Sequence, residues 1–548
     1  MTIQQSAQTL EQSATPQAAP GAPSFKSRHP ETQALHGGSF RFDPTTGAVA
    51  VPIYQTTSYQ LPGTEGADKL FALEAAGHLY TRVSNPTQDA FEQRLAELEG
   101  GAAALAVSSG QAASAFAILN VARAGDNIVS AAGLYGGTWA LFAATLKSFG
   151  VETRFVDTAD PEAFARATDE RTRAYYAESL ANPKLEVFPI AEVAAIGRRF
   201  GIPLIVDNTA APLIIRPLDH GATIVVYSAT KYIGGHGTSI GGAIIDGGDF
   251  PWAELKERQP NINEPDPSYQ GKTWVEKAEA IAFHPYILRA RAVLLRDIGA
   301  AISPQNAFQL IQGLETLPLR LRQHNDNAIK IAEYLKAHPK VSKVVFPKFQ
   351  TGAAAERAAK YLRTGSYGAL VGFELKGGRE AGRRFIDALA ALRRGSARHR
   401  RDARLCPPVD RHRAPGRPHR RSCPGDRRRL KTPGRHACLV QHAVFLRRSR
   451  LQPRKDRADD ICRLDANIGN RGDFPELAGR QSSERVEPRL RLSFAINHTG
   501  ALVHRQSEPE LVDGNQPPSL HSSKKRRMGY ASAFHACAVH DPIRIKRP

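Results

Sequence analysis

The sequence predicts an α/β fold in which a mostly parallel β-sheet is covered by helices on both faces. Between residues 100 and 250, short apolar segments typical of strands alternate with amphipathic segments typical of helices. Repeated strand–helix units form parallel sheets, and strands buried on both faces are continuous apolar runs. A less regular stretch at 304–390 predicts the start of a smaller α+β domain.

The predicted elements follow in chain order. We expect strands at 103–107, 127–130, 152–156, 173–178, 203–207, 223–228 and 242–246, and helices at 111–122, 137–149 and 188–200. Residues 250–273 are polar and rich in proline, so we expect a surface insertion there, followed by a long helix at 275–302. The smaller domain should contain helices at 305–336 and 378–390 and strands near 341–346 and 368–375.

Charge and cysteine content divide the 548 residues into two parts. Residues 391–548 contain 36 Lys+Arg and 15 Asp+Glu, which accounts for the whole formal net charge of +21. All five cysteines also follow residue 400 and form no C-x-x-C pair, so neither a zinc site nor a disulfide framework is predicted. A basic tail often indicates nucleic acid, but this one has few aromatic residues and no apolar periodicity, so nucleic-acid binding is the weaker interpretation.

These differences suggest four segments. We expect a disordered leader at 1–30, a large domain with an N-terminal arm at 31–303, a small C-terminal domain at 304–392, and a basic, disordered or frameshifted tail at 393–548. The leader is rich in Gln, Ala, Ser and Pro and has no apolar targeting segment. No apolar run of about 18 residues occurs, so no membrane span is predicted and a cytoplasmic location is expected.

A lysine that follows two hydroxyl residues is the first candidate for chemistry. Ser228, Thr230 and Lys231 follow an apolar strand and precede a Gly-Gly turn. A lysine just past a buried strand is expected to be partly desolvated, which favours the neutral amine that attacks a carbonyl. The two hydroxyls could bind a phosphate beside it. Taken alone, the motif fits an ordinary lysine in solvent at least as well.

Two further motifs lie where strands end. Asp207 ends an apolar strand, where open parallel sheets bind ligands, and its carboxylate could pair with a protonated pyridine nitrogen. Gly110 and Gln111 open a helix whose free N–H groups could bind a phosphate. Each has an ordinary structural alternative, a turn aspartate or a common glycine loop.

Three aromatic or polar motifs complete the set. Tyr80 and Arg82 could clamp a phosphate, Tyr135 among glycines could stack on a flat ligand, and Asn182 could donate to a ring oxygen. A core tyrosine, a surface arginine and a turn asparagine are the alternatives. The occurrence of all six motifs at one edge of the predicted sheet favours a cofactor site.

The motifs together resemble one enzyme family. From Thr32 to Leu389 the patterns Y-x-R-x-x-N-P-T, S-S-G-x-A-A, E-S-x-x-N-P, V-D-N-T and S-A-T-K-Y are similar to the Cys/Met-metabolism family of fold-type-I enzymes, which use pyridoxal 5′-phosphate (PLP). The resemblance implies an aspartate-aminotransferase-like large domain with a smaller C-terminal domain, incomplete in this chain. It also implies a homotetramer with active sites shared between subunits.

The same resemblance assigns roles to the site residues. It implies that Lys231 holds PLP covalently, that Asp207 pairs with the pyridinium, that Tyr135 stacks on the ring and that Asn182 contacts the ring hydroxyl. The phosphate would be held by Gly110, Gln111, Ser228 and Thr230, and by Tyr80 and Arg82 of a neighbouring subunit.

Further stretches resemble the family members that use O-acetylhomoserine. They are Val51–Thr57, Gly235–Thr238, the insertion near Glu264–Tyr269, and Gln312–Leu317. This resemblance implies a γ-replacement in which O-acetyl-L-homoserine and sulfide give L-homocysteine and acetate, with Tyr54 facing the substrate. An inactive PLP-binding protein, a cystathionine γ-synthase and a methionine γ-lyase remain alternatives.

The chain departs from the family after Leu389. The family's His-Pro and Ser-Thr-Thr-His stretch is absent, and the Arg-Leu-Ser of residues 491–493 lacks the glycine of the family's Arg-Leu-Ser-x-Gly motif, so we treat that match as coincidence. A smaller departure is Tyr227, where histidine is common. We therefore expect PLP binding but little activity. In the family, the arginine that binds the substrate α-carboxylate lies in the segment that is missing here.

Overall fold

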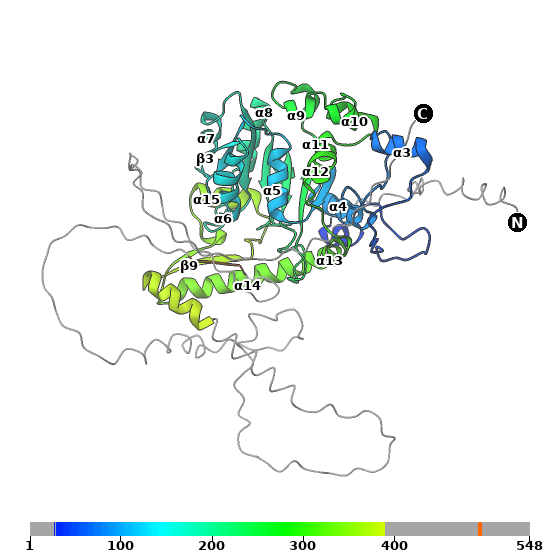
Figure 1. The fold of residues 1–548 in the computed structure, drawn as a ribbon. Helices are drawn as coiled ribbons and strands as arrows, with labels where there is room; N and C mark the ends of the chain where they lie inside the picture. Colours follow the sequence, from blue (N-terminus) through cyan, green and yellow to red (C-terminus); the bar gives the residue numbers. More distant parts are fainter. Residues whose placement is uncertain (1–26, 28, 390–491, 496–548) are drawn as a thin grey trace, which may run out of the picture. The chain divides into compact units, whose positions relative to one another are not determined.

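The computed structural model describes residues 27, 29–389 and 492–495 (Figure 1). The predictions for residues 1–26 and for the tail other than 492–495, including all five cysteines, lie outside the described residues. Within these ranges, no helix combines the length and the apolar character that crossing a membrane requires.

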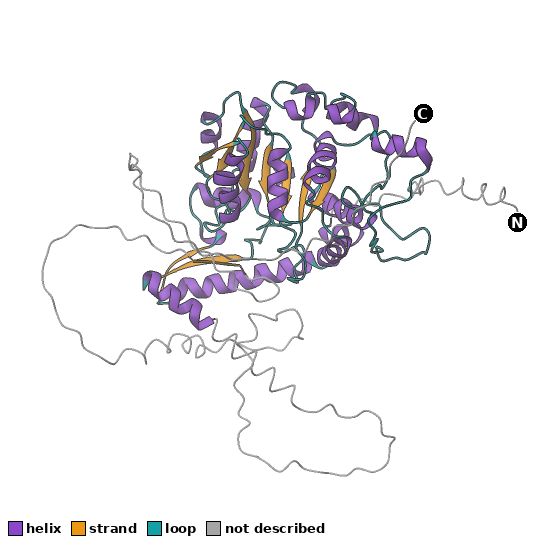
Figure 2. Ribbon diagram, in the orientation of Figure 1, coloured by secondary structure: helices purple, strands orange, loops and turns teal. Residues whose placement is uncertain are grey.

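A seven-stranded sheet forms the centre of the large domain and confirms the predicted α/β class (Figure 2). Its order is β1-β7-β6-β5-β4-β2-β3, and β7 runs antiparallel to both of its neighbours whereas β2 to β6 are parallel. All seven predicted strands are confirmed: β1 (Ala103–Val107), β2 (Asn127–Ala131), β3 (Glu152–Val156), β4 (Thr172–Glu178), β5 (Leu204–Asp207), β6 (Ile224–Tyr227) and β7 (Gly242–Asp246).

Helices cover both faces of this sheet, and successive strand residues alternate between them. On β4, for example, Tyr176 packs into one hydrophobic cluster and Tyr175 into another, and both are fully buried. One face is covered by α5 (Gly110–Leu119), α10 (Trp274–Ala280) and α11 (Pro285–Arg289). The other is covered by α4 (Pro86–Glu99), α7 (Pro161–Arg166), α8 (Ile190–Phe200) and α13 (Pro304–Glu315).

Helix α4 was not predicted, because it buries polar side chains that hide its apolar stripe. Glu92 and Arg94 are both about 5% exposed. Arg291 pairs with Glu92 at 2.5 Å, and Arg94 pairs with Glu315 at 3.1 Å. Helix α2 (Pro30–His36) packs against α4. The large domain also contains α3 (Gly63–Phe71) and α6 (Gly136–Ala140), and α6 continues into a π-helical stretch, Leu141–Leu146.

Two predicted long helices are each interrupted. The prediction of one helix at 275–302 is wrong, since α10 ends at Ala280, Ala282 takes a positive φ of 51°, and Pro285 starts α11. The helix then continues through Ala290–Leu295 to α12 (Arg296–Ile298). The predicted helix at 305–336 is likewise two helices, α13 and α14 (Leu317–Ala337), because a proline near the start of α14 cannot continue the helix before it.

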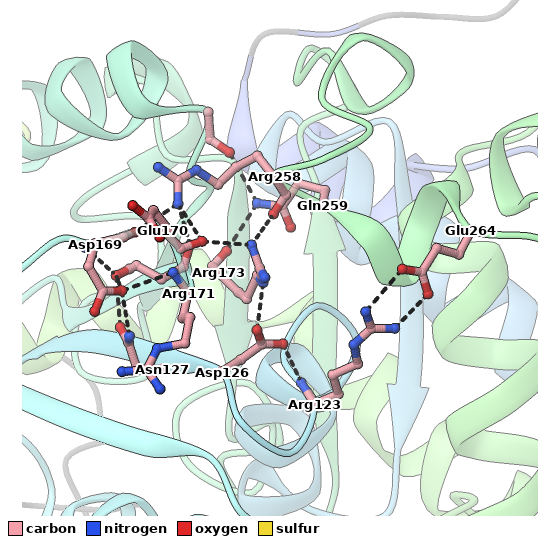
Figure 3. A network of polar contacts seen from close by, with 12 residues as sticks. Arg123, Asp126, Asn127, Asp169, Glu170, Arg171, Arg173, Arg258, Gln259 and Glu264 are labelled. Carbon is pink, nitrogen blue, oxygen red and sulfur yellow. Dashed lines mark hydrogen bonds and ion pairs between the residues drawn. The ribbon is translucent and has the colours of Figure 1, made fainter.

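Residues 250–273 lie at the surface as predicted, with about half of them exposed, but the segment is also anchored to the large sheet. Arg258 donates to Phe200 O at 3.0 Å and to Asp169 O at 2.8 Å, and fully buried Gln259 donates to Gly201 O at 3.1 Å. Figure 3 shows Arg258 and Gln259 within this network of polar contacts. These acceptors lie just before β4 and β5. The segment therefore covers the amino ends of these parallel strands, at the edge opposite their carboxyl ends. Its helical turns are Trp252–Glu254, α9 (Pro260–Asn263) and Pro267–Tyr269.

The smaller domain has a three-stranded antiparallel sheet of order β10-β9-β8, with α14 packed beside it (Figure 1). Strands β8 (Val341–Val345) and β9 (Leu370–Leu375) confirm the two predicted strands, α15 (Ala353–Tyr361) lies between them in sequence, and 378–389 are helical as predicted. Strand β10 (Leu492–Ala495) was not foreseen. It contains Leu492 and Ser493 of the Arg-Leu-Ser match that was treated above as coincidence, and it pairs with β9, so the prediction of a disordered tail is wrong for residues 492–495.

Candidate active site

The predicted site residues lie at the carboxyl ends of neighbouring strands. Glu178 at the end of β4 is the register partner of Asp207 at the end of β5, and β6 ends just before Ser228. On the far side of β7, β1 leads directly into α5 through Ser109. The edge therefore brings together groups that are up to 120 residues apart in sequence.

Lys231 lies on a tight turn after β6. Its backbone N–H donates to Ser228 O at 3.2 Å, and the Thr230 hydroxyl both donates to Gly241 O and accepts from Gly241 N–H, each at 3.1 Å. The Lys231 side chain is exposed. The predicted partial desolvation is therefore wrong for this chain by itself, because Lys231 is exposed although Ala229 before it and Tyr232 after it are buried.

Gly110 packs directly against Ser228. A Cβ added at Gly110 would lie 2.5 Å from Ser228 Cβ, which is too close for any side chain. Ser109 caps α5 by accepting the Ala112 N–H at 3.1 Å, so the helix begins with its amino end at this loop. The first N–H groups of a helix have no partner within it, and they can bind an anion beside the two serines.

Gln111 and Tyr135 meet over Gly137. A Cβ at Gly137 would lie 2.5 Å from Gln111 Nε2 and 2.5 Å from Tyr135 Cε1. Gly137, two residues after Tyr135, thus makes room for both side chains. Tyr135 is half-buried, which leaves part of its ring surface available to a flat ligand.

Asp207 is half-buried and held by its own turn. Burial raises the pKa of Asp207, while hydrogen bonding from Thr209 and the Tyr176 phenol opposes the rise. Its Oδ1 accepts the Thr209 N–H at 2.9 Å, and Thr209 Oγ1 accepts the Ser228 N–H at 2.8 Å. A carboxylate in such a position is stabilised by a cation, and a protonated ring nitrogen would supply one.

Sequence reasoning quoted Glu178 in a motif but gave it no role. Its carboxylate accepts the backbone N–H groups of Tyr135 and Asn182. Burial raises the pKa of Glu178 well above its usual range, and the charge of Asp207 raises it further. The only signal in the sequence for a role of Glu178 is that its carboxylate ends one predicted strand while a second carboxylate, that of Asp207, ends another.

Arg320 was also missed. Only 6% exposed, it donates to Tyr232 O at 2.6 Å, Ile233 O at 3.1 Å and Gly313 O at 2.5 Å. Burial lowers the pKa of Arg320 to about 10. It therefore ties the residues after Lys231 to the junction of α13 and α14, and the sequence carries no signal for contacts to backbone carbonyls so far away.

Three predicted residues are not brought to this cluster within the chain. Tyr80 is 42% exposed, and the Arg82 guanidinium lies 5.3 Å from its ring centroid. Across residues 29–389, no hydrogen bond joins this pair to Gly110 or Ser228. The Tyr54 phenol donates to Asp43 Oδ2 at 2.8 Å, and burial together with this bond raises the pKa of Tyr54.

The cluster suits a phosphorylated pyridine aldehyde such as PLP. It offers an amine for an aldehyde, a helix amino end and hydroxyls for a phosphate, and a carboxylate for a ring nitrogen. The close approach of Gly110 to Ser228, which no Cβ allows, forms the narrow part of this cradle. The residues present therefore fit the cofactor implied by the motifs.

Comparisons with known proteins agree with this geometry. Residues 31–394 match the family described as Cys/Met metabolism PLP-dependent enzyme. An O-acetyl-L-homoserine sulfhydrylase of Leptospira meyeri is 51% identical over 366 residues, covering 66% of this chain and 82% of that protein. A homocysteine synthase of Schizosaccharomyces pombe is 45% identical over 366 residues, covering 66% and 84%.

A solved structure is similar as well. The crystal structure of a Campylobacter jejuni protein named as an O-acetylhomoserine (thiol)-lyase superposes with a TM-score of 0.63 at 38% identity, covering 66% of this chain and 88% of that chain. It contains N′-pyridoxyl-lysine-5′-monophosphate, a lysine joined to the cofactor.

Proposed function

This chain belongs to the Cys/Met-metabolism family of PLP-dependent enzymes, and from that premise we propose that it catalyses γ-replacement on O-acetyl-L-homoserine. Sulfide displaces acetate from the γ-carbon and gives L-homocysteine, a transferase step of methionine and cysteine biosynthesis. The observation that carries the proposal is the similarity over 66% of the chain to proteins named for this reaction. A cytoplasmic location accords with such a biosynthetic role.

The residues of the strand-end cluster would hold the cofactor. Lys231 would bond it covalently, Asp207 would pair with its ring nitrogen, Tyr135 would stack on the ring, and Asn182 would contact the ring hydroxyl. Gly110, Gln111, Ser228 and Thr230 would hold the phosphate. Bound PLP supplies an electron sink that stabilises negative charge on the substrate α-carbon.

The chain's own part in the reaction is the movement of protons. The Lys231 amine, once free, accepts the proton from the substrate α-carbon and relays protons at the β-carbon. Its exposed position leaves it able to reach both carbons. At the γ-carbon the bond to the acetate oxygen breaks, and a bond to the sulfide sulfur forms.

We extend the proposal to a homotetramer in which Tyr80 and Arg82 serve a neighbouring subunit's phosphate site. The exposure of Tyr80 and the absence of bonds from this pair to the described cluster of its own chain support this arrangement. The N-terminal arm also exposes Phe42 and Val49, at 57% and 81%, which a partner subunit would cover.

An assay of homocysteine formation tests the proposed reaction directly. PLP-loaded protein is given O-acetyl-L-homoserine and sulfide, and the product is quantified. In parallel reactions cysteine replaces sulfide, or methionine is the sole substrate. Homocysteine formation should dominate. Faster cystathionine formation or methionine cleavage would favour the cystathionine γ-synthase or methionine γ-lyase alternative, and bound cofactor without any product would favour an inactive PLP-binding protein.

We also propose that turnover is weak in this chain, because its sequence after Leu389 lacks the family's substrate-binding segment. A substrate carboxylate left unpaired in a partly dry site costs about 2–5 kcal/mol. That corresponds to a loss of roughly thirty- to several-thousandfold in kcat/KM. A version of the gene with the reading frame restored after codon 390 is the comparison, and equal kcat/KM values for the two proteins would contradict this proposal.

A further inference from the structure

Glu178 connects two loops at the carboxyl edge of the sheet. It ends β4, its side chain is only 5% exposed, and its two carboxylate oxygens have different partners. Oε1 accepts the backbone N–H of Tyr135, and Oε2 accepts the backbone N–H of Asn182 at 3.1 Å. Tyr135 follows β2 and Asn182 follows β4, so one carboxylate joins segments that the chain itself does not connect.

The two loops also touch through a glycine. A Cβ added at Gly133, two residues before Tyr135, would lie 3.4 Å from Ala181 Cβ and 2.8 Å from Thr158 Oγ1. The loops therefore approach closely on one side of Glu178. Their relative position is set by this contact and by the two hydrogen bonds to the carboxylate.

The position is an unfavourable one for a carboxylate. Glu178 is the register partner of Asp207 on the next strand, so two acidic side chains lie side by side at a buried edge. A buried charge beside a like charge is destabilising unless donors compensate it. Here two backbone N–H groups, oriented by the loops, provide that compensation, and both oxygens are used.

We infer that Glu178 is a positioning residue that fixes Tyr135 relative to Asn182, and so holds the residue that stacks on the cofactor ring in register with the residue that contacts the ring hydroxyl. The inference rests on the proposed function, in which Tyr135 stacks on the face of that ring and Asn182 contacts its hydroxyl. Glu178 itself contacts neither the cofactor nor the substrate, since its oxygens face the loop backbones.

Glu178→Gln is the direct perturbation. The glutamine oxygen can accept one N–H, but its NH₂ group cannot accept the other, so one loop is released. We expect the dissociation constant of PLP, measured by titration of cofactor absorbance, to rise about ten- to a hundredfold. The visible absorption of the bound cofactor should also change, because its ring contacts are altered. Thermal unfolding of the cofactor-free variant checks that it is folded.

Asp246→Asn is the matched control. Asp246 is also a fully buried carboxyl at a strand end, and it accepts the Gly248 N–H at 2.9 Å, but it lies at the other end of the sheet. This variant should bind PLP within about twofold of wild type, even if its stability falls. Equal PLP affinity and equal absorption in wild type and Glu178→Gln would overturn the inference.

Two further arms separate the possible failures. Lys231→Ala should abolish covalent attachment. If wild type binds no PLP at Lys231, the proposed function is wrong. If PLP attaches normally but Glu178→Gln has no effect, only the inference about Glu178 is wrong. Should Glu178→Gln not fold, amide hydrogen exchange in wild type remains decisive. The amides of Tyr135 and Asn182 should both be protected, and rapid exchange at either would contradict the bridge.

Discussion

Replacing Arg320 should loosen the turn that carries Lys231. The buried guanidinium donates to three backbone carbonyls, those of Tyr232, Ile233 and Gly313, and none of its hydrogen bonds goes to a carboxylate. Arg320→Met keeps most of the side-chain volume and leaves these oxygens without their donor. Gly313 O keeps the Thr316 hydroxyl as a donor at 3.4 Å, so at about 1 kcal/mol for each of the other two carbonyls the free energy of unfolding should fall by about 2 kcal/mol.

Urea unfolding of the cofactor-free protein measures this loss, and PLP titration measures its effect on the site. Arg322→Met is the control on the same helix, because Arg322 is 62% exposed and pairs with Glu31 at the surface. The control should change stability by no more than about 0.5 kcal/mol and leave PLP affinity unchanged. If Arg320→Met is as stable as the control and binds PLP as tightly, the assigned role of Arg320 is wrong.

Two other predictions concern the cradle and the buried core. Gly110→Ala places a Cβ 2.5 Å from Ser228 Cβ, so the affinity for PLP should drop at least about tenfold. Gly136→Ala is the control, because a Cβ there has open space around it, and this variant should bind PLP normally. Equal affinities of the two variants in titration would refute the role of the Gly110–Ser228 contact in binding PLP. Burial raises the pKa of Glu99 from 4.5 to about 8, so the folded chain keeps a proton that the unfolded chain releases. The free energy of unfolding should therefore fall as pH rises from 4.5 to 8, and Glu99→Gln should flatten that slope in urea titrations; an unchanged slope would count against it.

The large sheet could be predicted because buried parallel strands are apolar runs between turn signals. Leu204–Asp207 illustrates this, with three apolar residues and then a carboxylate where the strand ends. The convergence of Asp207, Ser228 and Gly110 on one edge could be predicted too, because parallel strands present their carboxyl ends together. Gly110 in particular meets Ser228 at a distance that only glycine allows.

The elements and site residues that could not be predicted depend on contacts between residues far apart in the sequence. Helix α4 was hidden because its buried Glu92 is compensated by Arg291, about 200 residues away. The anchoring of the surface segment around Arg258 was missed because its guanidinium bonds to backbone carbonyls, which no sequence pattern reveals. The same reason concealed Glu178, whose partners are backbone N–H groups. The exposure of Lys231 was mispredicted because neighbouring side chains of a turn point in different directions: Ala229 and Tyr232 are buried, and Lys231 between them is exposed.

Attachment of PLP to Lys231 is the central claim, and chemical trapping tests it most directly. Purified full-length protein is incubated with PLP, reduced with borohydride, digested and mapped by mass spectrometry. The account predicts a single pyridoxyl-phosphate label on Lys231, which disappears in Lys231→Ala. A label on another lysine, or no label in wild type, would contradict it.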